Sequence, residues 1–249
     1  MNAAFTAEWL KYRRTLTPWI IVCWPMLLVL TETVLMPQSQ TWHETLMNTF
    51  NWWSVFGLSL CVTILAALST SYERRANSWN VLCARVVRPR VLYISKWVVL
   101  AAQLLAATVV FTALVLIINY LLWNPHGSPA VGQLIAGIAL VWIAALPQLA
   151  IMLWVASRVG IGVTVCIGLV GLVVGVVAAE APYWMVIPWA WAGRMLMPIF
   201  GFHINGLPLS PGSPFWNHDV IPIGIILSIV AAALFMVLGA IWFDRREVR

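Results

Sequence analysis

The chain has 249 residues, of which 62% are hydrophobic and only 9% are charged, and its formal net charge is +6. A typical soluble domain is about half apolar and about a quarter charged, so this composition excludes a water-soluble fold. Positive charge can indicate nucleic-acid binding in a soluble protein, but in a membrane protein it guides orientation, and no nucleic-acid partner is expected. The four cysteines show no CxxC or Cys/His spacing, so neither a disulfide framework nor a metal site is predicted.

Residues 1–17 are predicted to form a helix that lies along the membrane surface. Phe5 and Trp9 fall on one face of such a helix, whereas Lys11 and Arg14 fall on the other. This division is typical of an interfacial amphipathic helix. A cytosolic tail that only marks the topology is the alternative.

Six apolar stretches are long enough to cross a bilayer as helices, for which about 20 residues are needed. The predicted fold class is therefore an all-α polytopic membrane protein with a single transmembrane domain, residues 1–249. In the fifth stretch, Gly171 and Gly175 form a GxxxG pattern, which permits close packing. The spans are expected near 18–37, 49–70, 97–122, 131–157, 160–180 and 220–243.

The basic residues are distributed very unevenly among the connecting segments. Of the 14 lysines and arginines, all but Arg194 fall in four segments that six spans place on one side of the membrane. The positive-inside rule makes that side cytoplasmic. Both termini and the segment 71–96 are therefore predicted to be cytoplasmic, and three segments are predicted to be external: 38–48, 123–130 and 181–219.

One carboxylate, Glu32, falls within the first predicted span. It lies about 21 Å along the helix from Pro18, at a rise of about 1.5 Å per residue, which places it in the outer third of the bilayer. A carboxylate at that depth is costly unless it faces a cavity, a partner or the headgroups. We therefore expect Glu32, with Trp52 and Trp53 of the second span, to line a substrate path. A Glu32 that is paired with a partner or reaches the headgroups is the alternative.

The external segment 181–219 is too apolar for a simple solvated loop, although it contains six prolines and four tryptophans. Non-helical backbone near a membrane is tolerated only where protein covers it or where it lines a wet cavity. Residues 182–200 are predicted to form one or two short helices that dip into the outer leaflet, with their three tryptophans at headgroup level. An aromatic belt without a gating role is the alternative. The predicted external gate consists of Trp184, Trp189, Trp191 and Arg194.

The chain carries no sequence signature of an enzyme or of a nucleotide-binding site. No GxxxxGK[ST] occurs, and neither Lys11 nor Lys96 follows a glycine-rich loop. The four histidines lie in the external segments without ligand spacing, and metal sites need several converging ligands with a supporting shell. We expect them to be exposed polar side chains, and we predict no catalytic, metal or cofactor site in this chain.

Several local sequences carry a family resemblance. They are AEWLKYRRTLTPWIIVCWPM at the start, NWW in the second span, E-x-x-x-N-x-W in the basic segment and IPW before the last span. Together with six spans, both ends inside and a long apolar external segment before the sixth span, they resemble the permease subunit of type-2 ABC exporters. Within that group, the chain is most similar to the permeases of lantibiotic protection (immunity).

This resemblance implies a multi-pass subunit in the bacterial cytoplasmic membrane, in contact with membrane lipid. It implies pairing with a second permease, identical or homologous, and with a dimer of cytosolic ABC ATPase subunits that would bind ATP and Mg. The segment after the second span would form a short coupling helix seated in a cleft of the ATPase. A Trp beside paired arginines makes a good interface anchor, and the docking residues carried over are Glu73, Arg74, Arg75 and Trp79.

The function implied by the resemblance is the export or expulsion of a hydrophobic or cationic antimicrobial peptide. ATP hydrolysed by the separate subunit would supply the energy. Two alternatives remain open at this point. One is the permease of a general drug or lipid exporter, and the other is a membrane scaffold or sensor without transport, for which the segment 71–96 is only a topology signal.

Overall fold

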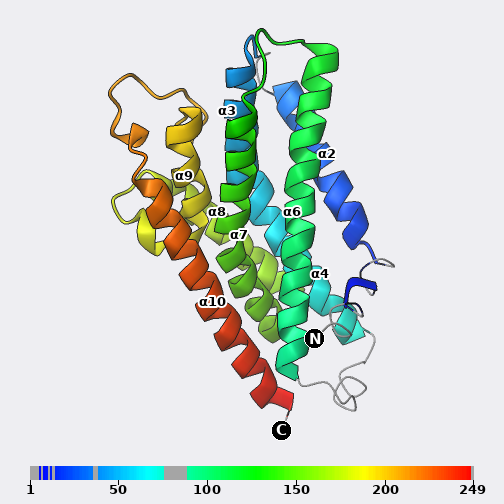
Figure 1. The fold of residues 1–249 in the computed structure, drawn as a ribbon. Helices are drawn as coiled ribbons and strands as arrows, with labels where there is room; N and C mark the ends of the chain where they lie inside the picture. The colour runs from blue at the N-terminus through cyan, green and yellow to red at the C-terminus, as the bar shows by residue number, and fades with distance from the viewer. Residues whose placement is uncertain are drawn as a thin grey trace.

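The computed structural model describes residues 6, 8–10, 12, 15–35, 39–75 and 89–247, without the side chains of residues 72–75 and 246–247. The described part is 84% helical and contains no β-strand. Its long helices form one bundle, in which α7 contacts most of the others (Figure 1). The main elements are α2 (Thr17–Leu35), α3 (Trp42–Trp52), η1 (Trp53–Gly57), α4 (Leu58–Arg75), α6 (Pro89–Leu122), α7 (Val131–Val159), α8 (Ile161–Ala179) and α10 (Val220–Glu247).

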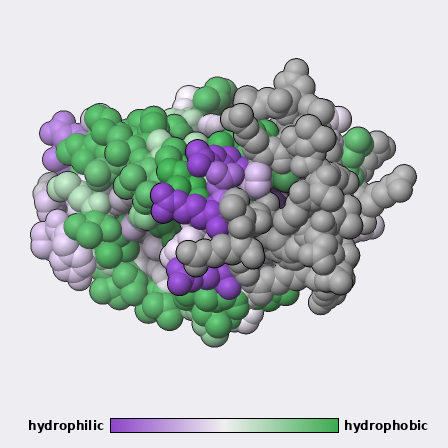
Figure 2. Space-filling view, turned by 90° about the horizontal axis from the view of Figure 1, so that it is seen from below, coloured by the Kyte–Doolittle hydropathy of each residue, from purple (hydrophilic) through white to green (hydrophobic). Residues whose placement is uncertain are grey.

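Six helices are long and apolar enough to cross a membrane, which confirms the predicted all-α polytopic fold at that level. Helix α2 starts, and α10 ends, at the same end of the bundle, as an even number of crossings requires (Figure 1). Seen from that end, hydrophilic residues gather near the middle, with hydrophobic residues beside them (Figure 2). The six candidate spans are Thr17–Leu35, Trp42–Ser71, Pro89–Leu122, Val131–Val159, Ile161–Ala179 and Val220–Arg245.

Two spans begin earlier than hydropathy alone predicted. The second begins at Trp42 rather than near residue 49, because Thr41 and Glu44 form a capping box: Thr41 Oγ1 accepts from the Glu44 N–H at 3.2 Å, and Glu44 Oε2 accepts from the Thr41 N–H at 3.3 Å. The third begins at Pro89 rather than near residue 97, and proline is well suited to the first helical position. The last eight residues of the predicted coupling segment 71–96 are therefore the first turns of α6.

The second span contains a π-helical turn, η1, that the sequence analysis did not predict. The N–H of Leu58 donates to the carbonyl of Trp53, five residues back, instead of four. The indole of Trp24 on α2 donates to the carbonyl of Gly57 at 3.1 Å. A Cβ at residue 57 would lie 2.4 Å from the ring of Trp53, so the close approach in this turn depends on glycine. π-Turns within helices are often found at functional sites.

The segment between α8 and α10 folds back against the bundle. It contains the 3₁₀ turns η2 (Trp184–Val186) and η3 (Pro188–Ala190), then α9 (Trp191–Phe200) and a loop with a third 3₁₀ turn, η4 (Pro214–Trp216). Helix α9 lies against α3 and α7, where Phe200 stacks on Phe50 with ring centroids 4.4 Å apart. Gly201, at φ +71°, ends this helix in the left-handed conformation.

Two tryptophans of this segment belong to the protein core. Trp184 and Trp191 are only 4% and 3% exposed, so they pack against protein, and their depth at the headgroups stays a prediction. The indole of Trp191 donates to the carbonyls of Trp184 and Met185 at 3.1 and 3.2 Å. These bonds satisfy the polar end of a buried tryptophan and fix the 3₁₀ turn against α9.

Candidate functional site

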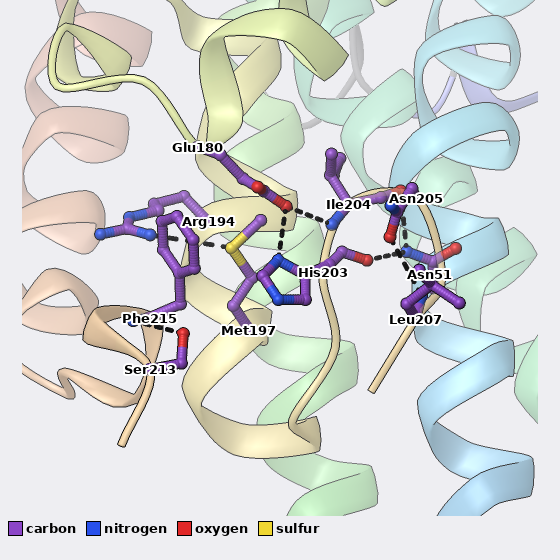
Figure 3. Close-up of polar contacts among 10 residues, drawn as sticks. All are labelled: Asn51, Glu180, Arg194, Met197, His203, Ile204, Asn205, Leu207, Ser213 and Phe215. Carbon is purple, nitrogen blue, oxygen red and sulfur yellow. Dashed lines mark hydrogen bonds and ion pairs between the residues drawn. The ribbon is translucent and has the colours of Figure 1, made fainter. Parts of the chain in front are cut away.

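Glu180, directly after α8, holds the loop that follows α9. Its Oε1 accepts a hydrogen bond from the backbone N–H of Ile204 at 2.8 Å and lies 3.2 Å from Nδ1 of His203 (Figure 3). The carboxylate therefore binds the loop through one backbone contact and one side-chain contact. The loop between residues 201 and 207 is tied in this way to the end of the fifth span.

Asn51 holds the same turn from the second span. It is 5% exposed, and its Nδ2 donates to the backbone carbonyls of His203 at 3.3 Å and Ile204 at 3.2 Å (Figure 3). Asn51 lies on the last turn of α3, immediately before the π-turn η1. The loop therefore bridges the second and fifth spans, and we call Asn51, Glu180, Arg194 and His203 the bridging cluster.

Arg194 on α9 is the cation of the bridging cluster. Its guanidinium carbon lies 4.7 Å from the ring centroid of Phe215 and 5.9 Å from that of Trp184. Burial lowers the pKa of the Arg194 guanidinium, and the negative charge of Glu180 acts in the opposite direction. Arg194 Nη1 donates to Met197 Sδ at 3.8 Å (Figure 3), and Nε has no hydrogen-bond partner among the described residues. The aromatic faces and the Glu180 charge add to the stabilisation of this half-buried cation.

A groove of about 360 Å³ adjoins the bridging cluster, and we call it the bridge groove. One wall comes from the second span and the other from α8, and the loop residues close one end. Apart from the indole N–H of Trp52, its polar lining side chains are Asn51 on α3 and Asn205 in the loop, so the groove is largely apolar along its walls and polar at the loop end. The lining residues are Asn51, Trp52, Val55, Phe56, Leu172, Val173, Val176, Val177, Ile204 and Asn205.

The three residues expected to line a substrate path occupy three different environments. Trp52 lines the bridge groove, with its ring 5.1 Å from that of Phe56. Trp53 is fully buried, where it stacks on Phe111 at 4.4 Å and donates from Nε1 to Thr108 Oγ1 at 3.2 Å. Adjacent residues of a helix point in different directions, so only Trp52 reaches the groove.

Glu32 lies at the contact between α2 and α3. It is 8% exposed, and its Oε1 accepts a hydrogen bond from Thr49 Oγ1 at 3.3 Å. Its second oxygen has no partner among the described residues. Glu32 does not line the bridge groove, whereas Trp52 does. The two residues predicted to share a substrate path are therefore not brought together in this groove.

Of the predicted gate residues, Trp189 packs where the GxxxG pattern lies on α8. A Cβ at Gly171 would lie 2.4 Å from the Trp189 side chain, and one at Gly175 would lie 2.6 Å from it. The two glycines therefore admit an indole rather than a second helix. Arg194 joins the bridging cluster, whereas Trp184 and Trp191 belong to the core.

The predicted docking and interfacial residues fall largely outside the described part. Trp79, Phe5, Lys11 and Arg14 lie outside it, and Trp9 is described as helical and 47% exposed. The backbone of residues 73–75 forms the last turn of α4, but the side chains of Glu73, Arg74 and Arg75 are not described. The coupling-helix and interfacial-helix assignments stay predictions.

The sequence analysis missed the bridging role of Asn51 and Glu180. Glu180 entered it only as the last residue of the fifth predicted span, 160–180, and Asn51 only as part of the second, 49–70. His203 was expected to be an exposed polar side chain like the other histidines, but it is half-buried and contacts Glu180. The signal that could have identified the site is a carboxylate directly after an apolar span and before a long apolar connection. No group of three potential metal ligands occurs among the described residues.

Comparison with known families places most of the chain in one family. A family model described as "ABC-2 family transporter protein" matches residues 4–175, well over half of the chain. The matched part includes Asn51 and the wall of the bridge groove formed by the second span, and it ends five residues before Glu180. No curated protein and no solved structure shows significant similarity to the chain.

Proposed function

Because the chain belongs to the ABC-2 transporter family, and so is a multi-pass permease subunit that works with an ABC ATPase, we propose that it expels a cationic antimicrobial peptide from the membrane. The host would be a bacterium whose cytoplasmic membrane the peptide attacks, and the role would be protection against a lantibiotic. The permease would pair with a second permease, identical or homologous. ATP and Mg would be bound by the dimeric partner ATPase and not by this chain.

The bridge groove is the observation that carries the substrate proposal. An amphipathic cationic peptide inserts its apolar face into the membrane interface and keeps its basic groups at the polar boundary. The groove offers apolar walls from Trp52, Phe56 and Val173, with the Asn51 and Asn205 amides at one end. The Glu180 carboxylate, 31% exposed, lies near that end, and the part of its charge that Arg194 and His203 leave unbalanced favours a cationic side chain. A volume of about 360 Å³ fits a few side chains, so the groove would hold one segment of the peptide.

The helix that lines the groove also reaches the segment proposed to dock on the ATPase, so it supports a mechanical connection between the two. Residues 42–75 form one helix through α3, η1 and α4, and it runs from the groove to the start of the predicted coupling segment. A movement of docked Glu73, Arg74, Arg75 and Trp79 would be passed along this helix to Asn51 and Trp52. Rigid elements that move as units are a common way to carry such changes.

A groove-filling substitution tests the proposal. Val173→Trp places an indole in the groove from an exposed position on α8, whereas Val174→Trp places one on the same helix outside the groove. In cells that express the chain with its ATPase, Val173→Trp should lower the inhibitory concentration of a cationic lantibiotic toward that of cells without the chain. Val174→Trp should leave protection unchanged at equal expression.

The same variants separate the alternatives. Undiminished protection by Val173→Trp would refute the role of the groove. If neither variant nor wild type protects, but Val173→Trp reduces efflux of an uncharged lipophilic dye, the chain is a general drug or lipid exporter. If the wild type, reconstituted with its ATPase, shows no substrate-stimulated ATP hydrolysis with either probe, a scaffold or sensor role is favoured.

A further inference from the structure

A second groove lies between α7 and α10, away from the bridging cluster. Its volume is about 410 Å³, and we call it the α7/α10 groove. The two helices contact each other extensively and part here enough to leave an open slot. Every lining residue is apolar or aromatic: Ala150, Ile151, Trp154, Phe235, Leu238, Gly239 and Trp242.

Two indoles mark one end of the α7/α10 groove. Trp154 and Trp242 meet edge to face, with ring centroids 6.2 Å apart and ring planes at 76°. Both lie close to the last turns of their helices, at the end of the bundle where α10 ends (Figure 1). Tryptophan is enriched where a membrane protein meets the headgroup region, and a pair of indoles near the helix ends is what a groove end at headgroup depth would show.

A cation lies beside the same end. The guanidinium carbon of Arg158, one turn after Trp154, is 5.7 Å from the Trp154 ring centroid, and the side chain is exposed. Arg245, three residues after Trp242, is also exposed, while the neighbouring Asp244 is paired with Arg90 at 2.5 Å. The charge next to the groove is therefore positive, and Figure 2 shows hydrophilic residues gathered at this end of the molecule.

We propose that the α7/α10 groove binds a phospholipid with an anionic headgroup. One acyl chain lies in the apolar slot between the helices, and the phosphate is held by Arg158 above the two indoles. Basic sites between membrane helices bind anionic headgroups in this way. This site is separate from the bridge groove, and the proposal does not depend on what the protein transports.

The chemistry of the slot favours an acyl chain over a peptide. An extended peptide would bring backbone N–H and C=O groups into a slot whose lining side chains offer almost no hydrogen-bond partners, which is costly in a membrane. An acyl chain brings no such groups. The cation at one end then selects among lipids by headgroup rather than by chain.

Native mass spectrometry of the purified full chain in detergent tests this site. The probes are phosphatidylglycerol and phosphatidylcholine with identical acyl chains. Wild type should bind phosphatidylglycerol more tightly, and Arg158→Gln should weaken that binding by about fivefold, since one basic residue near a membrane surface contributes roughly that factor. Arg158→Lys should retain most of it. Binding of phosphatidylcholine, whose choline offsets the phosphate charge, should weaken by less than binding of phosphatidylglycerol in Arg158→Gln.

A second pair of variants tests the slot itself. Leu238→Trp fills the groove from α10, whereas Leu234→Trp, from an equally exposed position one turn earlier, does not line it. Leu238→Trp should weaken binding of both lipids, and Leu234→Trp should weaken neither. Equal affinity of wild type for the two lipids, or no effect of Arg158→Gln, would overturn the proposal. It would also be overturned if Leu238→Trp, but not Leu234→Trp, dissociated a dimer of the chain, because a second copy would then occupy the groove.

Discussion

At the scale of single residues, Glu180 connects three parts of the bridging cluster. It accepts from the Ile204 backbone, contacts His203 and offsets the burial of Arg194. These three interactions join the end of α8 to the loop and to α9. Their loss should therefore loosen the closed end of the bridge groove rather than the bundle as a whole.

Replacing Glu180 tests this role. Glu180→Ala removes every contact and should lower the free energy of unfolding by about 1–2 kcal/mol, the range for a hydrogen-bonded charge that is partly exposed. Glu180→Gln keeps an acceptor for the Ile204 N–H but loses the charge, so its loss should be smaller. Thermal unfolding of the two purified variants in detergent measures the difference. Equal stability of Glu180→Ala and wild type would show that the loop is held without the carboxylate.

At the scale of elements, hydropathy predicted the six spans because each span needs only length and apolar character. It could not predict η1, because the residues WSVFG have no property that separates a π-turn from an ordinary helical turn. The turn depends instead on the fit of Gly57 against Trp53 and on the Trp24 indole, a residue of another helix. The burial of Trp184 and Trp191 was missed for a similar reason. A tryptophan-rich segment at a membrane boundary has the same sequence composition whether its indoles face lipid or protein.

The π-turn provides a stability prediction with a matched control. Gly57→Ala places a methyl group 2.4 Å from the Trp53 ring and 3.0 Å from Leu28, so it should cost about 1–3 kcal/mol through overpacking. Gly162→Ala adds the same methyl group in open space on α8 and should be neutral or slightly stabilising, because alanine is the better helix former. Comparison of the two melting temperatures in the same detergent measures the effect. A Gly57→Ala protein as stable as Gly162→Ala would mean that η1 can relax without cost.

At the scale of the whole molecule, the bridging cluster joins parts of the chain that the family match separates. Asn51 lies within the matched residues 4–175, whereas Glu180, Arg194 and His203 lie beyond them. The fold class could be predicted from composition, and the family from local motifs. The site could not, because the Asn51 side of it depends on contacts between residues more than 150 positions apart.

Binding of the partner ATPase through Glu73 and Trp79 is a prediction at the scale of the whole molecule. Glu73→Ala and Trp79→Ala should each reduce the amount of ATPase that co-purifies with the permease, because they remove the proposed anchors. Arg88→Ala, in the same basic segment but not among the carried-over docking residues, should leave that amount unchanged. Quantified pull-down from membranes with equal permease levels gives the measurement. Equal losses in all three variants would indicate a general charge effect rather than specific docking.

The continuous helix of residues 42–75 has a further consequence through its π-turn. A π-turn accommodates an additional residue within a helix, and each residue advances an α-helix by about 100° of rotation, since a turn holds about 3.6 residues. Residues 53–57 therefore determine how far the Asn51–Trp52 face is rotated about the helix axis relative to α4. If the turn converted to regular α-helix during a transport cycle, the groove wall would rotate relative to α4 without either half of the helix unfolding. The extra residue gives this span a built-in way to turn one of its halves against the other.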